Sequence, residues 1–142
     1  MQTFLPYASY VLSAACLDRQ RLGKQRIEVL QIHNALTGVK AGWQNHPAVL
    51  MWKGYEDSLL LYGAIICDEW QKRGYKDTVG MKIVMRCGGR VLDATSPPWN
   101  SDEEFHLAHR SNLIRKDPTW YRELWPEVPD NLPYIWPVQV QS

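Results

Sequence analysis

Large apolar side chains recur every three or four positions between residues 48 and 73, and this spacing limits the fold more than any other feature of the sequence. The recurring residues are Trp52, Tyr55, Leu59, Tyr62, Ile66 and Trp70. Because an α-helix turns once in about 3.6 residues, these side chains share one helix face. Gly74 follows as a natural helix terminator. We therefore predict a long helix over residues 48–73 with its aromatic face in a hydrophobic core.

Capping residues predict further helices. The expected spans are 10–17 after Ser9, 18–36 before Gly38, 101–115 behind the Ser101–Glu104 capping box, and 119–124 after Asp117 and Pro118. Residues 1–7 are expected to form an extended arm, residues 83–85 fit a short helix or a strand, and the proline-rich tail wraps over a surface. The 142 residues are thus predicted to form an all-α, compact single-domain helical bundle over 1–142, with long loops and a Pro-rich C-terminal tail.

Composition constrains the cellular environment of the protein more than it constrains the activity. The net charge is +1, so a surface that binds a polyanion must come from local clustering of cations. The three cysteines lack metal-like spacing, which favours a reduced intracellular environment. No run approaches the roughly 20 apolar residues of a membrane span. We expect a monomeric cytoplasmic protein without a membrane anchor.

The densest charged segment surrounds a lone acid, Glu28. The cations that precede it are Arg19, Arg21, Lys24 and Arg26. On a helix, Arg21, Lys24 and Glu28 lie on one stripe. Two interpretations of Glu28 remain open: a solvated partner of Lys24 four positions earlier, or an acid–base or charge-stabilising group in a cationic pocket.

Three further polar residues also have two interpretations each. Arg26 and His33 fall within the apolar arc of the same helix, so Arg26 needs either an opening to solvent or a partner, such as a phosphate or a carboxylate in a cleft. His33 is then a hydrogen-bonded core histidine or part of a site. His46 caps the following helix or belongs to a site on its loop. The four histidines have no companions that complete a recognisable ligand set, so no metal is predicted.

Three segments together resemble the phage pyrimidine-dimer DNA glycosylase/AP-lyase family, known as endonuclease V. They are the Arg21–Glu28 helix, the helix end from Asp68 to Thr78, and the Arg115–Tyr121 stretch with the His109–Asn112 helix before it. The resemblance implies an all-helical enzyme that needs no metal or cofactor. It also implies that the partner is double-stranded DNA carrying a damaged base.

The resemblance further implies that the N-terminal α-amino group is the nucleophile, which attacks C1′ of the damaged nucleotide, and that Glu28 is the family glutamate. Since Gln2 has a large side chain, we expect Met1 to be retained, so the nucleophile is the Met1 amine, or Lys24 in its place. Thr3 and Phe4 occupy the region where the family has a basic residue, which leaves the identity of the lesion open. DNA contacts are assigned to Gln2, Arg19, Arg21, Arg26, Asn45, His46, Arg115, Lys116 and Trp120.

The leading hypothesis is a nucleoid-associated DNA-repair glycosylase with AP-lyase activity on pyrimidine dimers or a related damaged or modified base. A non-catalytic helical nucleic-acid-binding module on the same scaffold is the alternative. A protein-interaction domain that uses its aromatic residues as an interface is a third, weaker option. Salt-dependent DNA binding without cleavage would select the module, and absence of duplex binding would select the interaction domain.

Overall fold

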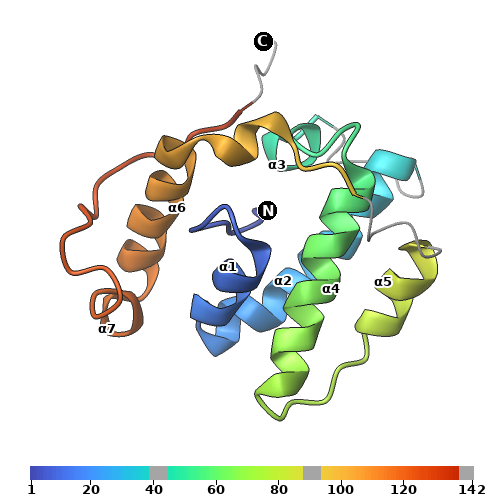
Figure 1. Ribbon diagram of the computed structural model, residues 1–142, viewed down its shortest axis with the longest axis horizontal. Helices are drawn as coiled ribbons and strands as arrows, with labels where there is room; N and C mark the ends of the chain where they lie inside the picture. The colour runs from blue at the N-terminus through green and yellow to red at the C-terminus, as the bar shows by residue number, and fades with distance from the viewer. Residues whose placement is uncertain (39–44, 88–93, 138–142) are drawn as a thin grey trace.

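The computed structural model describes residues 1–38, 45–87 and 94–137 (Figure 1). Within these ranges the helical elements are α1 (Tyr10–Cys16), α2 (Arg19–Thr37), α3 (Pro47–Leu50), α4 (Glu56–Lys72), α5 (Gly80–Cys87), the 3-10 helix η2 (Pro98–Ser101), α6 (Glu103–Lys116) and α7 (Pro118–Tyr121). The described residues form no strand, so the predicted all-α class is confirmed. None of the described helices is long and apolar enough to cross a bilayer.

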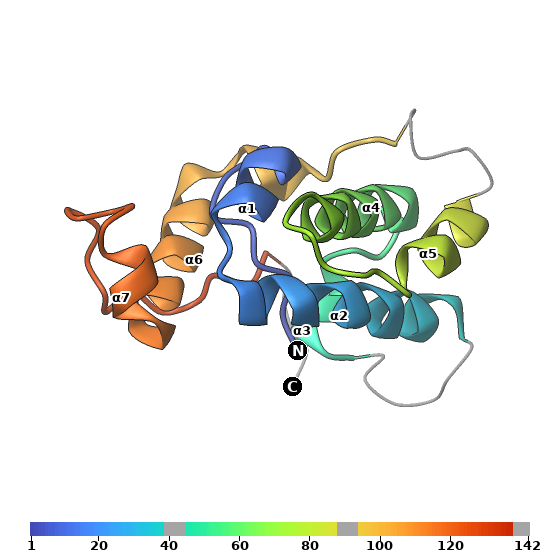
Figure 2. The same ribbon diagram turned by 90° about the horizontal axis from the view of Figure 1, so that it is seen from below.

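Helices α2 and α4 form the centre of the core (Figures 1 and 2). Helix α2 begins where the Asp18 side chain accepts a hydrogen bond from the Arg21 N–H, and it ends at Gly38, whose φ is 75°. Gly63 of α4 lets the two helices approach closely, since a Cβ there would lie 2.6 Å from Cγ1 of Val29. Helices α1 and α5 pack against the other sides of α4.

The helix predicted over residues 48–73 is wrong in one respect, because it is two helices, α3 and α4. Gly54 lies between them with a φ of 87°, far from the helical value of about −63°. The aromatic stripe still identifies core residues correctly. Trp52 is fully buried although it lies outside both helices, and its indole N–H donates to Oγ1 of Thr3 at 3.0 Å.

The other predicted boundaries are mostly confirmed. Ser9 caps α1, and residues 83–85 lie within a helix, α5. Helix α6 begins one residue later than the predicted capping box requires, because Ser101 belongs to η2 and Asp102 is the N-cap. Gly23, within α2, has a packing reason: a Cβ there would lie 3.0 Å from the Trp70 ring. The sequence also predicts a loop over residues 42–47, of which 42–44 lie outside the described ranges, and a turn at Gly88 and Gly89, which lies wholly outside them.

The N-terminal arm, residues 1–8, separates two groups of helices. Helix α6 packs on α7 and η2, whereas α2 packs on α4 and α3. In Figures 1 and 2 the arm runs between α6 on one side and the α2–α4 pair on the other. Both groups of helices therefore contact the first residues of the chain.

Candidate active site

The arm is buried, so its backbone polar groups need partners inside the protein. On the α2 side these partners are side chains. Gln2 donates its N–H to Oε2 of Glu28 at 3.0 Å, and Phe4 donates to Oε1 of Gln25 at 3.0 Å. Nε2 of Gln25 donates to the Gln2 carbonyl at 2.9 Å, and the Tyr62 hydroxyl donates to the Phe4 carbonyl at 2.7 Å. Side chains of α2 and α4 therefore bind the arm as a neighbouring strand would.

On the α6 side, two buried histidines bind both polar groups of Leu5. The Leu5 N–H donates to Nδ1 of His109 at 2.9 Å, and Nδ1 of His106 lies 2.7 Å from the Leu5 carbonyl oxygen. Arg110, one residue further, donates to the Pro6 carbonyl at 2.7 Å. The arm is thus held from both groups of helices by contacts to its backbone.

His109 makes the stability of the protein depend on pH. Burial, reinforced by the charge of nearby His106, lowers the pKa of His109 from 6.5 to about 3. Between these values the unfolded chain binds a proton that the folded chain does not, so stability is complete above pH 6.5 and falls as the pH falls. We expect the free energy of unfolding to decrease by about 1.4 kcal/mol per pH unit from this group. Urea denaturation between pH 7 and 5 measures it.

The control for this pH dependence is His109→Asn, which keeps a hydrogen-bond acceptor for Leu5 and removes the titrating group. The wild-type protein should lose stability more steeply than the variant as the pH falls from 6.5. Parallel slopes for the two proteins would show that His109 does not carry the effect.

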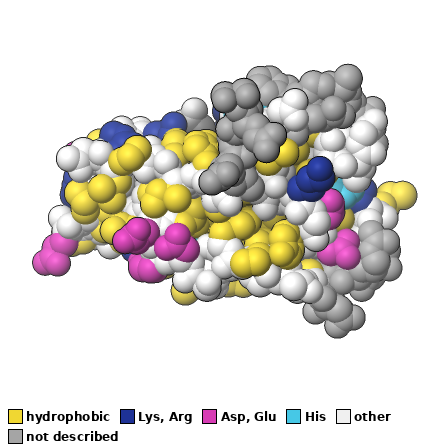
Figure 3. All heavy atoms as spheres, turned by 90° about the horizontal axis from the view of Figure 1, so that it is seen from above, with side chains coloured by type: hydrophobic (Ala, Val, Ile, Leu, Met, Phe, Trp, Pro, Cys, Tyr) yellow, Lys and Arg dark blue, Asp and Glu magenta, His cyan; other side chains and the backbone are white. Residues whose placement is uncertain are grey.

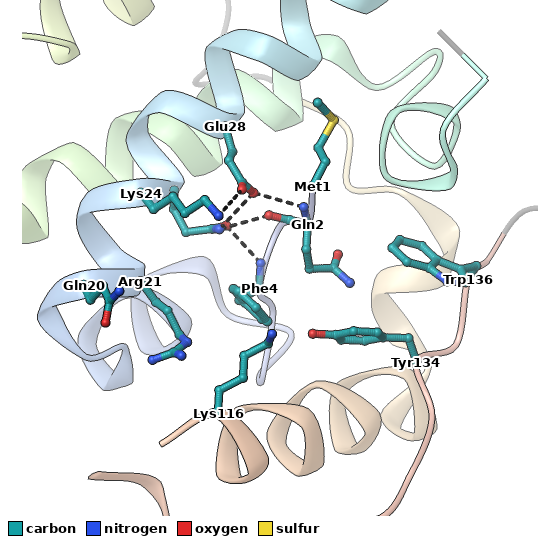
Figure 4. A pocket seen from close by; sticks show the side chains of 11 residues that line it. Met1, Gln2, Phe4, Gln20, Arg21, Lys24, Glu28, Lys116, Tyr134 and Trp136 are labelled. Atoms are coloured by element: carbon teal, nitrogen blue, oxygen red, sulfur yellow. Dashed lines mark hydrogen bonds and ion pairs between the residues drawn. The ribbon is translucent and has the colours of Figure 1, made fainter. Parts of the chain in front are cut away.

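Glu28 lies in a cavity of about 270 Å³ at the end of the arm (Figure 4). Its carboxylate accepts from the Gln2 N–H and from Nε2 of Gln25, the latter at 3.4 Å, and Nζ of Lys24 lies 3.6 Å away. The interpretation of Glu28 as a solvated helix residue is therefore wrong, because only 6% of it is exposed. The predicted pairing with Lys24 is present, and the hydrogen bonds from Gln2 and Gln25 accompany it.

The cavity is locally basic. Arg21 and Lys24 from α2 and Lys116 from the end of α6 line it, around the single carboxylate of Glu28. Arg21 is oriented by Asp18, with 3.2 Å between Nη1 and Oδ2. On the face of the molecule that Figure 3 shows, the Lys and Arg side chains (dark blue) lie in separate places among apolar and acidic side chains. The cluster at the cavity thus supplies the local positive charge that the near-neutral total does not.

Met1 is also part of the cavity wall. Met1 lines it, and only the Met1 Cα and carbonyl carbon separate its nitrogen from the Gln2 N–H that binds Glu28. Desolvation lowers the pKa of His46, the charge of the N-terminal amine lowers it further, and Glu28 opposes them. His46 also caps α3, since its Nδ1 accepts from the Ala48 N–H at 3.0 Å. The charges of the Met1 amine and of Glu28 therefore both act on the His46 ring.

Two aromatic residues of the C-terminal segment complete the cavity, and the sequence interpretation missed both. Tyr134 and Trp136 face Met1 and Glu28 across it (Figure 4). Burial raises the pKa of Tyr134 to about 12, against the opposing charges of Arg115 and Arg21. The described part of the tail lies over α6, as expected, where Asn112 and Arg115 donate to the Leu132 carbonyl. The sequence signal that the tail contributes to the cavity was the presence of two aromatic residues between Pro133 and Pro137.

Some predicted site residues lie outside this cavity. Arg26 contacts a carboxylate, with 2.8 Å between its Nη1 and Oδ1 of Asp77, and its guanidinium lies 4.4 Å from the centre of the Trp70 ring. Together with Arg19 and Trp120 it lines a second cavity of about 730 Å³, which we call the outer groove. Lys24 lines both cavities, so they occupy adjacent faces of α2.

The remaining residues considered from the sequence also lie outside the cavity. Arg115 holds the tail by donating to the carbonyls of Asp130 at 2.6 Å and Leu132 at 2.9 Å. His33 is buried, with its Nδ1 3.1 Å from Nη1 of Arg86. Asn45 is exposed and does not line the cavity. Within the described ranges, no group of three or more His, Cys, Asp or Glu side chains gathers as a metal site would require.

The family model for pyrimidine dimer DNA glycosylase matches residues 1–83. The chain belongs to this family. Searches of curated proteins and of solved structures gave no match. The span shared with the pyrimidine dimer DNA glycosylases contains Met1, Lys24 and Glu28. The cavity wall formed by Lys116, Tyr134 and Trp136 lies beyond it, as does the Arg115–Tyr121 stretch that contributed to the resemblance.

Proposed function

We propose that this pyrimidine dimer DNA glycosylase family member excises a pyrimidine dimer or a related damaged base from duplex DNA and then cleaves the strand as an AP lyase. One observation carries the proposal: a buried carboxylate, Glu28, binds the N–H next to the Met1 amine inside a basic cavity. A nucleophile, an acid–base group and phosphate-binding cations are the components that this reaction needs.

The proposed reaction begins with the neutral Met1 amine. Its lone pair attacks C1′ of the damaged nucleotide, and the N-glycosidic bond breaks with its electron pair leaving on the base. Glu28 accepts a proton from the amine as the new C–N bond forms, and its charge stabilises the positive charge that develops at C1′. Opening of the sugar gives an imine. Loss of a proton from C2′ then expels the 3′ phosphate and breaks the strand.

Arg21, Lys24 and Lys116 are proposed to bind the phosphates on either side of the damaged nucleotide, and the outer groove contacts the duplex further along. These contacts are electrostatic, so affinity should fall steeply with salt concentration. A damaged base pair is already weakened, which lowers the cost of opening the duplex. We propose that a monomer performs the reaction.

Borohydride tests the chemistry directly. Reduction of the imine should trap the protein covalently on duplex DNA that carries an abasic site or a pyrimidine dimer. Peptide mass spectrometry should locate the adduct on Met1. An adduct on Lys24 would assign the nucleophile to that side chain instead. Salt-sensitive binding with neither trapping nor base excision would select the non-catalytic nucleic-acid-binding module.

A further inference from the structure

The two buried histidines of α6 face a part of the chain that carries the proposed nucleophile. Described contacts hold α6 against α7 and η2, and hold α2 against α4, while the arm runs between these groups (Figure 1). His106 and His109 bind the carbonyl and N–H of Leu5. Each group of helices also supplies one wall of the cavity, Glu28 from α2 and Lys116 from α6.

The chemistry of the pair is unusual for a packing role alone. His109 accepts through Nδ1, so the proton of its neutral ring is on Nε2, which is buried and has no partner in the described structure. An unsatisfied buried N–H is costly, and a purely apolar residue would avoid it. Such a residue would also leave the Leu5 N–H without an acceptor. The pair is therefore suited to holding a backbone segment in one position.

The contacts of the pair reach both the arm and the cavity. Nε2 of His106 lies 2.9 Å from the Asn100 carbonyl oxygen, which ties the ring to the end of η2. The ring of His109 packs edge-on against that of Tyr134, with 5.6 Å between their centres, and Tyr134 lines the cavity. Displacement of these rings would thus shift the arm and the opposite wall together.

We propose that His106 and His109 are positioning residues, which fix the Leu5 peptide groups and thereby set where the Met1 amine stands relative to Glu28. This inference rests on the proposed function. It assigns a positioning role to residues of α6, which lies outside the span matched by the family model. Neither ring lines the cavity, so their effect on the reaction is indirect.

Paired substitutions at His106 separate positioning from packing. The amide of Asn lies as many bonds from Cα as Nδ1 does, and the amide of Gln reaches the place of Nε2. His106→Asn therefore keeps the bond to Leu5 and loses the one to Asn100, whereas His106→Gln does the reverse. We expect the single-turnover excision rate to fall at least about tenfold in His106→Gln and to stay within about threefold in His106→Asn, because small displacements of a nucleophile are costly.

Both His106 variants should lose similar thermal stability, and their affinity for lesion DNA should be unchanged. Equal excision rates in the two variants, or rates that simply follow their stability, would overturn the proposal. If one of them does not fold, His109→Asn and His109→Gln provide the same comparison, because only Asn retains an acceptor in place of Nδ1.

Amide hydrogen exchange gives a readout that does not depend on excision. The Gln2 amide, which binds Glu28, should exchange at least about tenfold faster in His106→Gln than in His106→Asn if the histidine restrains the whole arm. Faster exchange in His106→Gln than in His106→Asn, together with a wild-type protein that excises no lesion, would retain the restraint of the arm by His106 and refute the proposed function. Unchanged exchange together with unchanged excision would refute the positioning role alone.

Discussion

Replacing Glu28 by Gln will reduce base excision and strand cleavage by at least about 10²-fold, the contribution typical of an acid–base group. Gln has the same shape and can still accept the Gln2 N–H, so the arm should remain in place. What is lost is the negative charge beside C1′ and the ability to take a proton from the amine. Single-turnover excision from a lesion duplex, with binding measured in parallel, tests this expectation.

Glu69→Gln is the matched control for this substitution. Glu69, on α4, binds Arg73 at 3.0 Å, away from the cavity, and its replacement changes the net charge by the same amount. Binding of duplex DNA should therefore change alike in the two variants, whereas excision should fall only in Glu28→Gln. Loss of folding and binding together in Glu28→Gln would instead mean that Glu28 is structural. Retained excision would remove it from the mechanism.

Blocking the first amine should have an effect at least as large. Acetylation of Met1 delocalises the nitrogen lone pair into an amide, which is not nucleophilic, and one additional residue before Met1 moves the amine by about 3.5 Å. We expect either change to reduce borohydride trapping and strand cleavage at least about 10²-fold, since the reacting atoms no longer meet. The fraction of protein trapped on abasic duplex measures the effect.

Lys24→Arg distinguishes the two amines. Arginine keeps the positive charge beside Glu28 but is always protonated, so it cannot form an imine. If Met1 is the nucleophile, Lys24→Arg should trap nearly as well as the wild-type protein. The opposite pattern, with trapping kept in the acetylated protein and lost in Lys24→Arg, would assign the reaction to Lys24.

Local signals in the sequence predicted most of the fold. Ser9, Asp18 and Gly38 mark helix ends through their own side chains or backbone freedom, so the positions of α1 and α2 could be derived from them. The break between α3 and α4 could not. Trp52 and Tyr55 fit the helical spacing, but Trp52 is buried by contact with the arm, and the backbone of Gly54 and Tyr55 departs from helical dihedral angles.

The site was predictable only where its residues lie close together in sequence. Arg21, Lys24 and Glu28 share one helix, so their common stripe followed from the helical period. The burial of Glu28 depends on the arm, and the partner of Arg26 is Asp77, distant in sequence. Long-range packing brings such groups together, and no local pattern encodes it. The same reason explains why Tyr134 and Trp136 were missed.

The hydrogen bonds that hold the arm are mostly made to its peptide groups, and this affects how such proteins diverge. Thr3 and Leu5 are fully buried, so their own side chains are limited by the space around them and, for Thr3, by the bond from Trp52. A bond to a peptide group does not depend on the side chain of the arm residue, so the polar restraint falls on the acceptors and donors that face the arm, among them Gln25 and His109. Distant relatives should therefore be easier to recognise by those opposing residues than by the residues at their amino termini.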